Sequence, residues 1–225
     1  MALVFLVFWL ILFIWRKDTR REMLVMSVIF SLAGSVADVI YTKDWWRPIT
    51  LTKTIIGPED ILVGFMIGGI AAVLYEIIFK KKLRIKNKNK TNRTKRNLFL
   101  FLLLLFSAAL FFGCFYVIKL NSLYSTIAAF AVPTIIIYVA RKDLIVNSLF
   151  SGLLLAVVAS LVYGALELMT PGWIKTFWYF KNTPDVVLFN VPLDDIIWYF
   201  LAGLFIGPLY EFWQEGKLSE KTNKL

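Results

Sequence analysis

The sequence predicts an all-α integral membrane protein with about seven transmembrane helices. Hydrophobic residues make up 59% of the 225 residues, and they occur in runs near the ~20 residues that a helix needs to cross a bilayer. A stretch with acidic residues at one end and Tyr-Glu at the other occurs twice, and Lys and Arg gather in alternate loops. Together these observations predict two parallel three-helix repeats that are joined by a linker helix.

The repeat is clearest between residues 60–76 and 195–211, which match at an offset of 135. Seven positions are identical, including the leading aspartate and the closing Tyr-Glu pair. Chance matches are common between apolar helices but less common between their polar ends. Residues 21–31 resemble residues 141–151 as well, so the repeat extends over most of each half.

The apolar runs place the expected spans at about residues 2–15, 23–41, 59–79, 97–118, 123–139, 144–168 and 193–213. We expect residues 1–79 to form the first three-helix repeat and residues 123–225 to form the second. Residues 80–122 then supply a basic cytoplasmic loop and the linker helix. Three spans alone would invert the second repeat, and the linker helix restores its orientation.

The positive charge is unevenly distributed along the chain. The formal net charge is +10, and ten of the 25 Lys and Arg lie in residues 80–96. With the N-terminus outside, the inner segments hold 19 Lys and Arg and the outer loops hold 6, as the positive-inside rule expects. The charges therefore indicate a multi-pass protein of the cell membrane with a cytoplasmic C-terminus, whose basic loop contacts anionic lipid and not nucleic acid.

The composition excludes several kinds of chemistry. The chain has no His and a single Cys, Cys114, which leaves no Ser-His-Asp arrangement and few ligands for zinc or non-haem iron. Gly64, Gly68 and Gly69 lie inside an expected span and do not follow a strand, so they are not a dinucleotide fingerprint. We therefore expect neither a cofactor nor a metal.

Six acidic residues are expected at one level, near the outer ends of the spans. They are Asp38, Glu59, Asp60, Glu167, Asp194 and Asp195. Carboxyls within spans are costly and are candidates for function, although first-turn acids also stabilise the helix dipole. A carboxyl that stays protonated in this setting can act as a general acid.

Aromatic residues are expected at the same level as the acids. They are Trp45, Trp46, Trp173, Trp178, Trp198 and Tyr199. An interfacial aromatic belt explains such residues without any ligand. Together their ring faces could also stabilise a carbocation in a substrate.

Pro192-Leu193-Asp194-Asp195, followed by an apolar helix that ends in Tyr210-Glu211, resembles the small integral-membrane lycopene cyclases of bacteria, archaea and fungi. Each half of those proteins carries a Pro-x-acid-acid motif. The first half of this chain departs from that motif, because Pro58 directly precedes Glu59.

The resemblance implies cofactor-free cyclisation of the end group of a linear carotenoid. Asp195 and Asp60 would then handle the protons, Asp194 and Glu59 would tune them, and the supporting acids Asp38 and Glu167 would complete the network. The implied partners are the lipid bilayer and a hydrophobic polyene. A second copy of the chain and other enzymes of the carotenoid pathway are further candidates.

Two other functions fit the same composition. A membrane carrier or proton-coupled transporter of a lipophilic substrate would use the acids to bind an ion, although transporter sites usually lie near the midplane. A related membrane terpene cyclase would use the same acid chemistry. A retinal photoreceptor is disfavoured because the later spans contain no interior Lys for a Schiff base.

The charge asymmetry generates a prediction about topology. A single cysteine introduced into residues 80–96 of a Cys114→Ser protein should resist a membrane-impermeant thiol reagent in intact cells, because this loop faces the cytoplasm. The same cysteine should react after the cells are opened. Labelling from outside would contradict the predicted orientation.

Overall fold

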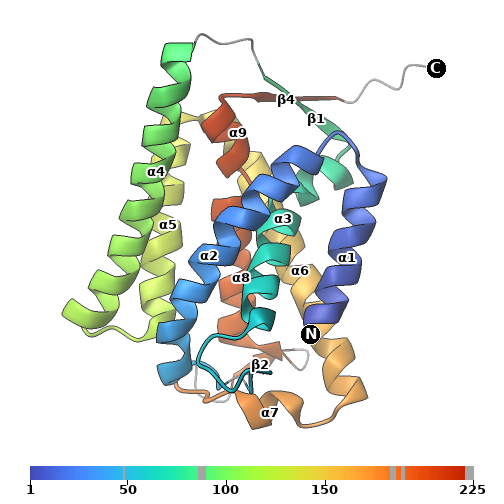
Figure 1. Ribbon diagram of the computed structural model, residues 1–225, viewed down its shortest axis with the longest axis vertical. Coiled ribbons are helices and arrows are strands. Elements are labelled where there is room, and N and C mark those ends of the chain that lie inside the picture. The colour runs from blue at the N-terminus through green and yellow to red at the C-terminus, as the bar shows by residue number, and fades with distance from the viewer. Residues whose placement is uncertain (48, 86–89, 183–185, 189–190, 221–225) are drawn as a thin grey trace.

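The computed structural model is a bundle of apolar helices that describes residues 1–47, 49–85, 90–182, 186–188 and 191–220 (Figure 1). The helices are α1 (Ala2–Trp15), α2 (Arg20–Asp44), α3 (Pro58–Ile78), α4 (Lys90–Phe112), α5 (Ser122–Ala140), α6 (Ile145–Met169), α7 (Trp173–Phe177), α8 (Leu193–Ile206) and α9 (Leu209–Gln214). A π-helical turn, Gly113–Val117, extends α4. The strands β1 (Lys81–Arg84) and β4 (Lys217–Glu220) pair antiparallel, as do β2 (Val187–Leu188) and β3 (Val191–Pro192).

The architecture confirms the all-α membrane class. Among the described residues, six helical segments are long and apolar enough to cross a membrane, and α1 is a shorter apolar helix. At ~1.5 Å per residue α1 is about 21 Å long, which is less than the ~30 Å of a hydrocarbon core. The expected seventh span is therefore this shorter helix, and the exact number of crossings stays a prediction.

The helices pack by the same scheme in both halves of the chain. In the first half α3 packs against α2 and α1, and in the second half α8 packs against α6 and α5. The remaining long helix, α4, packs mainly on α5, and Figure 1 shows these two side by side at one edge of the bundle. This arrangement brings the N-terminal ends of α3 and α8 to the same end of the molecule.

Glycines permit the close contacts between these helices. A Cβ atom at Gly68 of α3 would lie 2.7 Å from the backbone oxygen of Met26, and one at Gly203 of α8 would lie 2.5 Å from that of Ser151. Both separations are too short for a real side chain. Small residues let helix backbones approach where lipid supplies no hydrophobic driving force between them.

These contacts align α2 with α6 in a different register from the one that the sequence match suggested. Met26 and Ser151 occupy equivalent places and are 125 residues apart, whereas the sequence match of residues 21–31 with 141–151 gives an offset of 120. Apolar helical segments resemble each other in several registers, which explains the difference. The repeat itself stays a prediction.

Two ion pairs agree with the register of 125. Arg16 Nε donates to Asp18 Oδ1 at 3.0 Å, and Arg141 NH2 donates to Asp143 Oδ2 at 2.7 Å. Arg16 also donates at 2.8 Å to the backbone oxygen of Lys81, which follows α3. Arg141 donates at the same distance to the backbone oxygen of Gly216, which follows α9. The hydrogen bond to Asp143 is the main cause that raises the pKa of Arg141, so this guanidinium stays charged.

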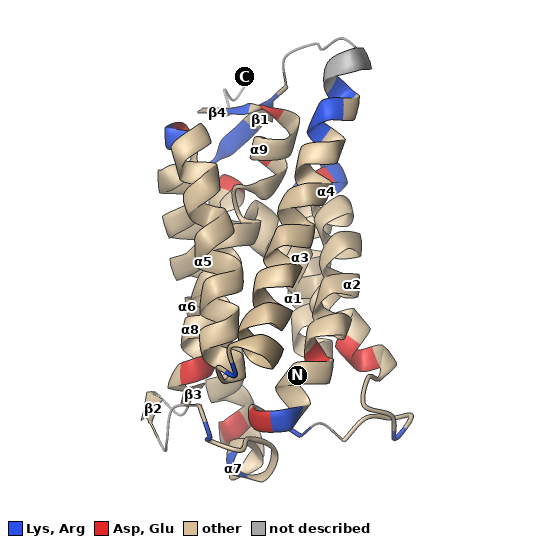
Figure 2. Ribbon diagram, turned by 90° about the vertical axis from the view of Figure 1, so that its left-hand side faces the viewer, with Lys and Arg blue, Asp and Glu red and all other residues tan. Residues whose placement is uncertain are grey.

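The basic residues are unevenly distributed along the bundle. Figure 2 shows Lys and Arg concentrated at the end that carries β1, β4 and the start of α4, whereas acidic residues mark the ends of helices at the opposite end. The six acids that were expected at one level lie at the end opposite this basic end, although other acidic residues lie at the basic end as well.

The glycine contact generates a prediction about stability. Gly203→Ala should lower the thermal unfolding midpoint in detergent, because the added methyl group forces α6 and α8 apart at a cost of about 1–3 kcal/mol. Gly113→Ala is the matched control, since a Cβ atom there would meet no atom within 4 Å. Equal unfolding midpoints for the two variants would contradict this account of the packing.

Candidate active site

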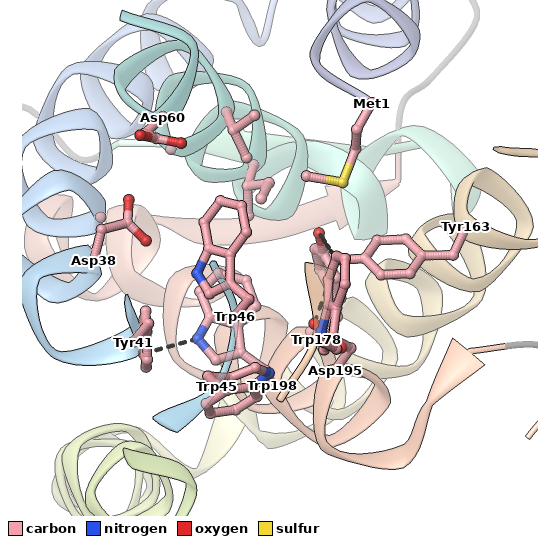
Figure 3. A pocket seen from close by; sticks show the side chains of 15 residues that line it. Met1, Asp38, Tyr41, Trp45, Trp46, Asp60, Tyr163, Trp178, Asp195 and Trp198 are labelled. Atoms are coloured by element: carbon pink, nitrogen blue, oxygen red, sulfur yellow. Dashed lines mark hydrogen bonds between the residues drawn. The ribbon is translucent and has the colours of Figure 1, made fainter. Parts of the chain in front are cut away.

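A cavity of about 90 Å³ lies at the acidic end of the bundle, where α2 ends and α3 and α8 begin (Figure 3). We call it the acid cavity. Its walls come from both halves of the chain. They are formed by Met1, Gly34, Asp38, Tyr41, Trp45, Trp46, Asp60, Val63, Gly64, Ile67, Tyr163, Trp178, Asp195, Trp198 and Tyr199.

Three of the predicted acids line the acid cavity, and all three are buried. They are Asp38 from α2, Asp60 from the first turn of α3 and Asp195 from the first turn of α8. Figure 3 shows Asp38 and Asp60 on one side and Asp195 on the other, with Trp46 between them. Residues far apart in the sequence therefore supply carboxyls to two sides of one small space.

The local contacts of Asp60 and Asp195 differ. The backbone N–H of Gly57 donates to Asp60 Oδ2 at 2.8 Å, which fixes this side chain at the start of α3. The Tyr163 hydroxyl donates to Asp195 Oδ1 at 3.3 Å. Asp195 Oδ2 and the indole nitrogen of Trp178 are buried and have no hydrogen-bond partner among the described residues. Both groups lie on the Asp195 side of the cavity, where the Trp178 and Trp45 side chains are close enough to interact with the Asp195 carboxyl.

The structure does not bring the other three predicted acids into the acid cavity. Asp194 is buried and accepts a hydrogen bond from the backbone N–H of Asp195 at 3.1 Å. Glu59 accepts one from the backbone N–H of Leu51 at 2.8 Å. Glu167 accepts from the backbone N–H groups that begin α7, at 2.7 and 3.1 Å. These contacts give the three acids a role in holding the chain around the site.

The predicted aromatic residues gather at the acid cavity with one exception. Trp45, Trp46, Trp178, Trp198 and Tyr199 line it. Trp173 does not line the cavity, but its ring packs against that of Trp178, with the ring centroids 5.1 Å apart.

A hydrogen-bonded chain fixes one wall of the cavity. The indole nitrogen of Trp198 donates to the Tyr41 hydroxyl at 2.9 Å, and this hydroxyl lies 3.0 Å from Thr126 Oγ1. Buried indole and phenol groups need such partners. The Trp198 ring is therefore held in a fixed orientation where it lines the acid cavity.

Sequence reasoning missed Tyr163 and Tyr41. Tyr163 lies within a long apolar run, where a single tyrosine carries no motif. In the register of 125 residues it occupies the place of Asp38, so an acid in one half corresponds to a phenol in the other. The register of 125 residues that the helix contacts indicate would have pointed to it.

A second acidic cluster lies at the opposite end of the bundle. Glu22, Glu76 and Glu211 are buried, and each offers a carboxylate oxygen within 4.8 Å of those of the others. The Asn147 amide donates to Glu211 Oε1 at 2.5 Å. Glu76 follows Asp60 by 16 residues in α3, which is about 24 Å along the helix. The cluster is thus separate from the acid cavity, and three such ligands are a set that could hold a cation.

The fold and the acid cavity define a multi-pass membrane protein with carboxyls and aromatic rings around one buried space. Residues 121–213 match the family model described as lycopene cyclase, and this segment includes Asp194 and Asp195. This match supports an assignment of the second half of the chain to the lycopene cyclase family, in agreement with the Pro192 motif. No curated protein and no solved structure matches the chain.

Proposed function

We propose that the protein cyclises the end groups of a linear, lycopene-like carotenoid by cofactor-free acid–base chemistry within the membrane. One observation carries this proposal. Asp38, Asp60 and Asp195 line a single aromatic-walled cavity, in a chain whose second half matches the lycopene cyclase family. The reaction is an isomerisation, so it needs a proton donor, a proton acceptor and a dry surface for a cation.

Asp195 is the proposed proton donor. Its carboxyl gives a proton to the terminal double bond of the end group, whose electron pair forms the new C–H bond and leaves a tertiary carbocation. The neighbouring double bond attacks this carbon, which closes a six-membered ring and moves the positive charge into the ring. Asp195 suits the first step because its Oδ2 atom has no hydrogen-bond partner among the described residues.

The carboxyls on the opposite side are the proposed base. Asp60, held by the Gly57 N–H, or Asp38 beside it removes a proton from a ring carbon, and the C–H electron pair becomes the ring double bond. One proton enters and a different proton leaves, so atoms and electrons balance. A donor and an acceptor on two sides of the end group allow both steps without rotation of the substrate.

The aromatic walls would stabilise the cation between these steps. Ring faces attract positive charge by about 0.5–2 kcal/mol each, more when water is absent. Trp46 lies between the two groups of acids in Figure 3, and Trp45 and Trp198 line the same space. The walls would also exclude water that could capture the cation as an alcohol.

Both acidic motifs contribute to one cavity, which bears on how the two ends of a carotenoid are treated. A single cavity accepts one end group at a time. A doubly cyclised product therefore requires release and re-entry of a carotenoid with one ring. The altered first motif, with Gly57 before Pro58, would then affect both ends equally.

The direct test is expression in a lycopene-producing host with chromatography of the pigments. The wild-type protein should yield cyclic carotenoids. Asp195→Asn should reduce cyclisation by about 10²–10⁴-fold at an unchanged membrane level, because the amide keeps the shape and cannot donate the carboxyl proton. Asp60→Asn should cause a smaller loss, since Asp38 remains beside it, and both ring closures should slow, so that linear and monocyclic carotenoids remain beside the bicyclic product.

Asp143→Asn is the matched control, because Asp143 lies at the opposite end of the bundle in an ion pair with Arg141. This variant should cyclise like the wild type. Near-normal cyclisation by Asp195→Asn would overturn the proposed mechanism. Unchanged lycopene with a well-expressed wild-type protein would overturn the proposed function and favour a carrier.

A further inference from the structure

A second, larger cavity of about 370 Å³ adjoins the acid cavity. We call it the chain groove. It is lined by α2, α3, α4, α5 and α8. The two cavities share five lining residues, which are Gly34, Tyr41, Gly64, Ile67 and Trp198. The chain groove is therefore continuous with the acid cavity and meets it at these residues.

The chain groove is lined by apolar side chains and by three hydroxyl groups that are hydrogen-bonded within the protein. Its three hydroxyl-bearing residues have their polar atoms engaged elsewhere. Ser107 donates to the backbone oxygen of Ala129 at 2.6 Å, Thr126 donates to that of Ser122 at 2.8 Å, and the Tyr41 hydroxyl pairs with Trp198. The groove thus suits a hydrocarbon and offers these hydroxyls to no polar ligand.

The chain groove also reaches the lipid-facing surface. Leu32 and Val36 of α2 line it and are 67% and 52% exposed. On the other side, Ala108 of α4 lines it and is exposed as well. Because α4 packs mainly on α5, the groove lies where α2 and α4 face each other at the edge of the bundle.

We propose that the chain groove holds the acyclic hydrocarbon chain of the substrate, which enters from the lipid between α2 and α4 while its end group occupies the acid cavity. This inference rests on the proposed function, because it extends the same substrate. The occupant is a long linear polyene without polar groups along its chain. A water-soluble substrate would need polar partners and an aqueous entrance, and the lining described above provides neither.

Gly34, which lines both cavities, would then determine whether the substrate can extend from the chain groove into the acid cavity. A Cβ atom at Gly34 would lie 3.5 Å from the Cα atom of Gly64, an ordinary contact, whereas one at Gly64 would lie 2.8 Å from the backbone oxygen of Phe30. Helix packing therefore requires the glycine at position 64 but tolerates a side chain at position 34. A larger side chain at Gly34 would extend into the junction of the two cavities, which Gly34 lines.

The test measures binding of linear lycopene to the purified protein in detergent, followed by the shift of the polyene absorption bands. Gly34→Leu should weaken binding about tenfold or more, because the junction is filled. Ala108→Phe should do the same by filling the groove from α4. Ala109→Phe is the matched control, because Ala109 is the next residue of the same helix, is exposed and does not line the groove.

Wild-type affinity in Ala109→Phe, with weak binding in the other two variants at unchanged unfolding midpoints, supports the groove. Equal binding by Ala108→Phe and Ala109→Phe would overturn it, as would failure of the wild-type protein to bind lycopene. The proposed function is judged separately. If lycopene binds with this pattern of variants but is never cyclised, the groove stands and the cyclase proposal fails.

Discussion

The close contact of the central helices with their partners sets the position of every group in the acid cavity. Within a bilayer, helices gain little from burying apolar surface against each other, so their spacing depends on how closely the backbones can approach. Gly64 and Gly68 allow α3 to lie against α2, and Gly203 allows α8 to lie against α6. The first turns of α3 and α8, which carry Asp60 and Asp195, are thereby fixed at one depth.

This placement has a cost that the proposed function explains. Buried carboxyls are expensive in a membrane protein, and the acid cavity gathers three of them with few partners. Asp60 is held by one backbone N–H and Asp195 by one phenol. A site that needed only stability would hold apolar residues instead. Proton donors and acceptors within reach of an apolar substrate are a reason to retain such a cluster, and the adjoining chain groove would supply the substrate.

Much of the site could be predicted from the sequence because repeats and polar residues stand out in apolar runs. The membrane class followed from the length of the apolar runs, and the convergence of Asp60 with Asp195 and the aromatic surroundings followed from the repeat and the depth that the charge asymmetry assigned to these residues. The exclusion of Glu59 and Glu167 from the cavity did not, since a depth along a helix does not say which way a side chain points. Both side chains instead accept backbone hydrogen bonds in adjoining loops.

The remaining features depend on contacts between distant helices. Tyr163 enters the site because α6 packs against α8 much as α2 packs against α3, an arrangement that an apolar sequence match could not fix. The cluster of Glu22 with Glu76 likewise requires α2 and α3 to meet at a particular height. The chain groove has no motif at all, because it consists of the space left between α2 and α4 by small residues such as Ala108.

The central claim is that a carboxyl of the acid cavity supplies the proton that begins cyclisation. The most direct test is cyclisation of lycopene by the purified protein in D₂O, followed by mass spectrometry of the product. Carboxyl protons exchange with solvent, so each ring formed should carry one carbon-bound deuterium. Cyclic product free of deuterium would mean that the proton moves within the substrate, and it would contradict the role assigned to Asp195.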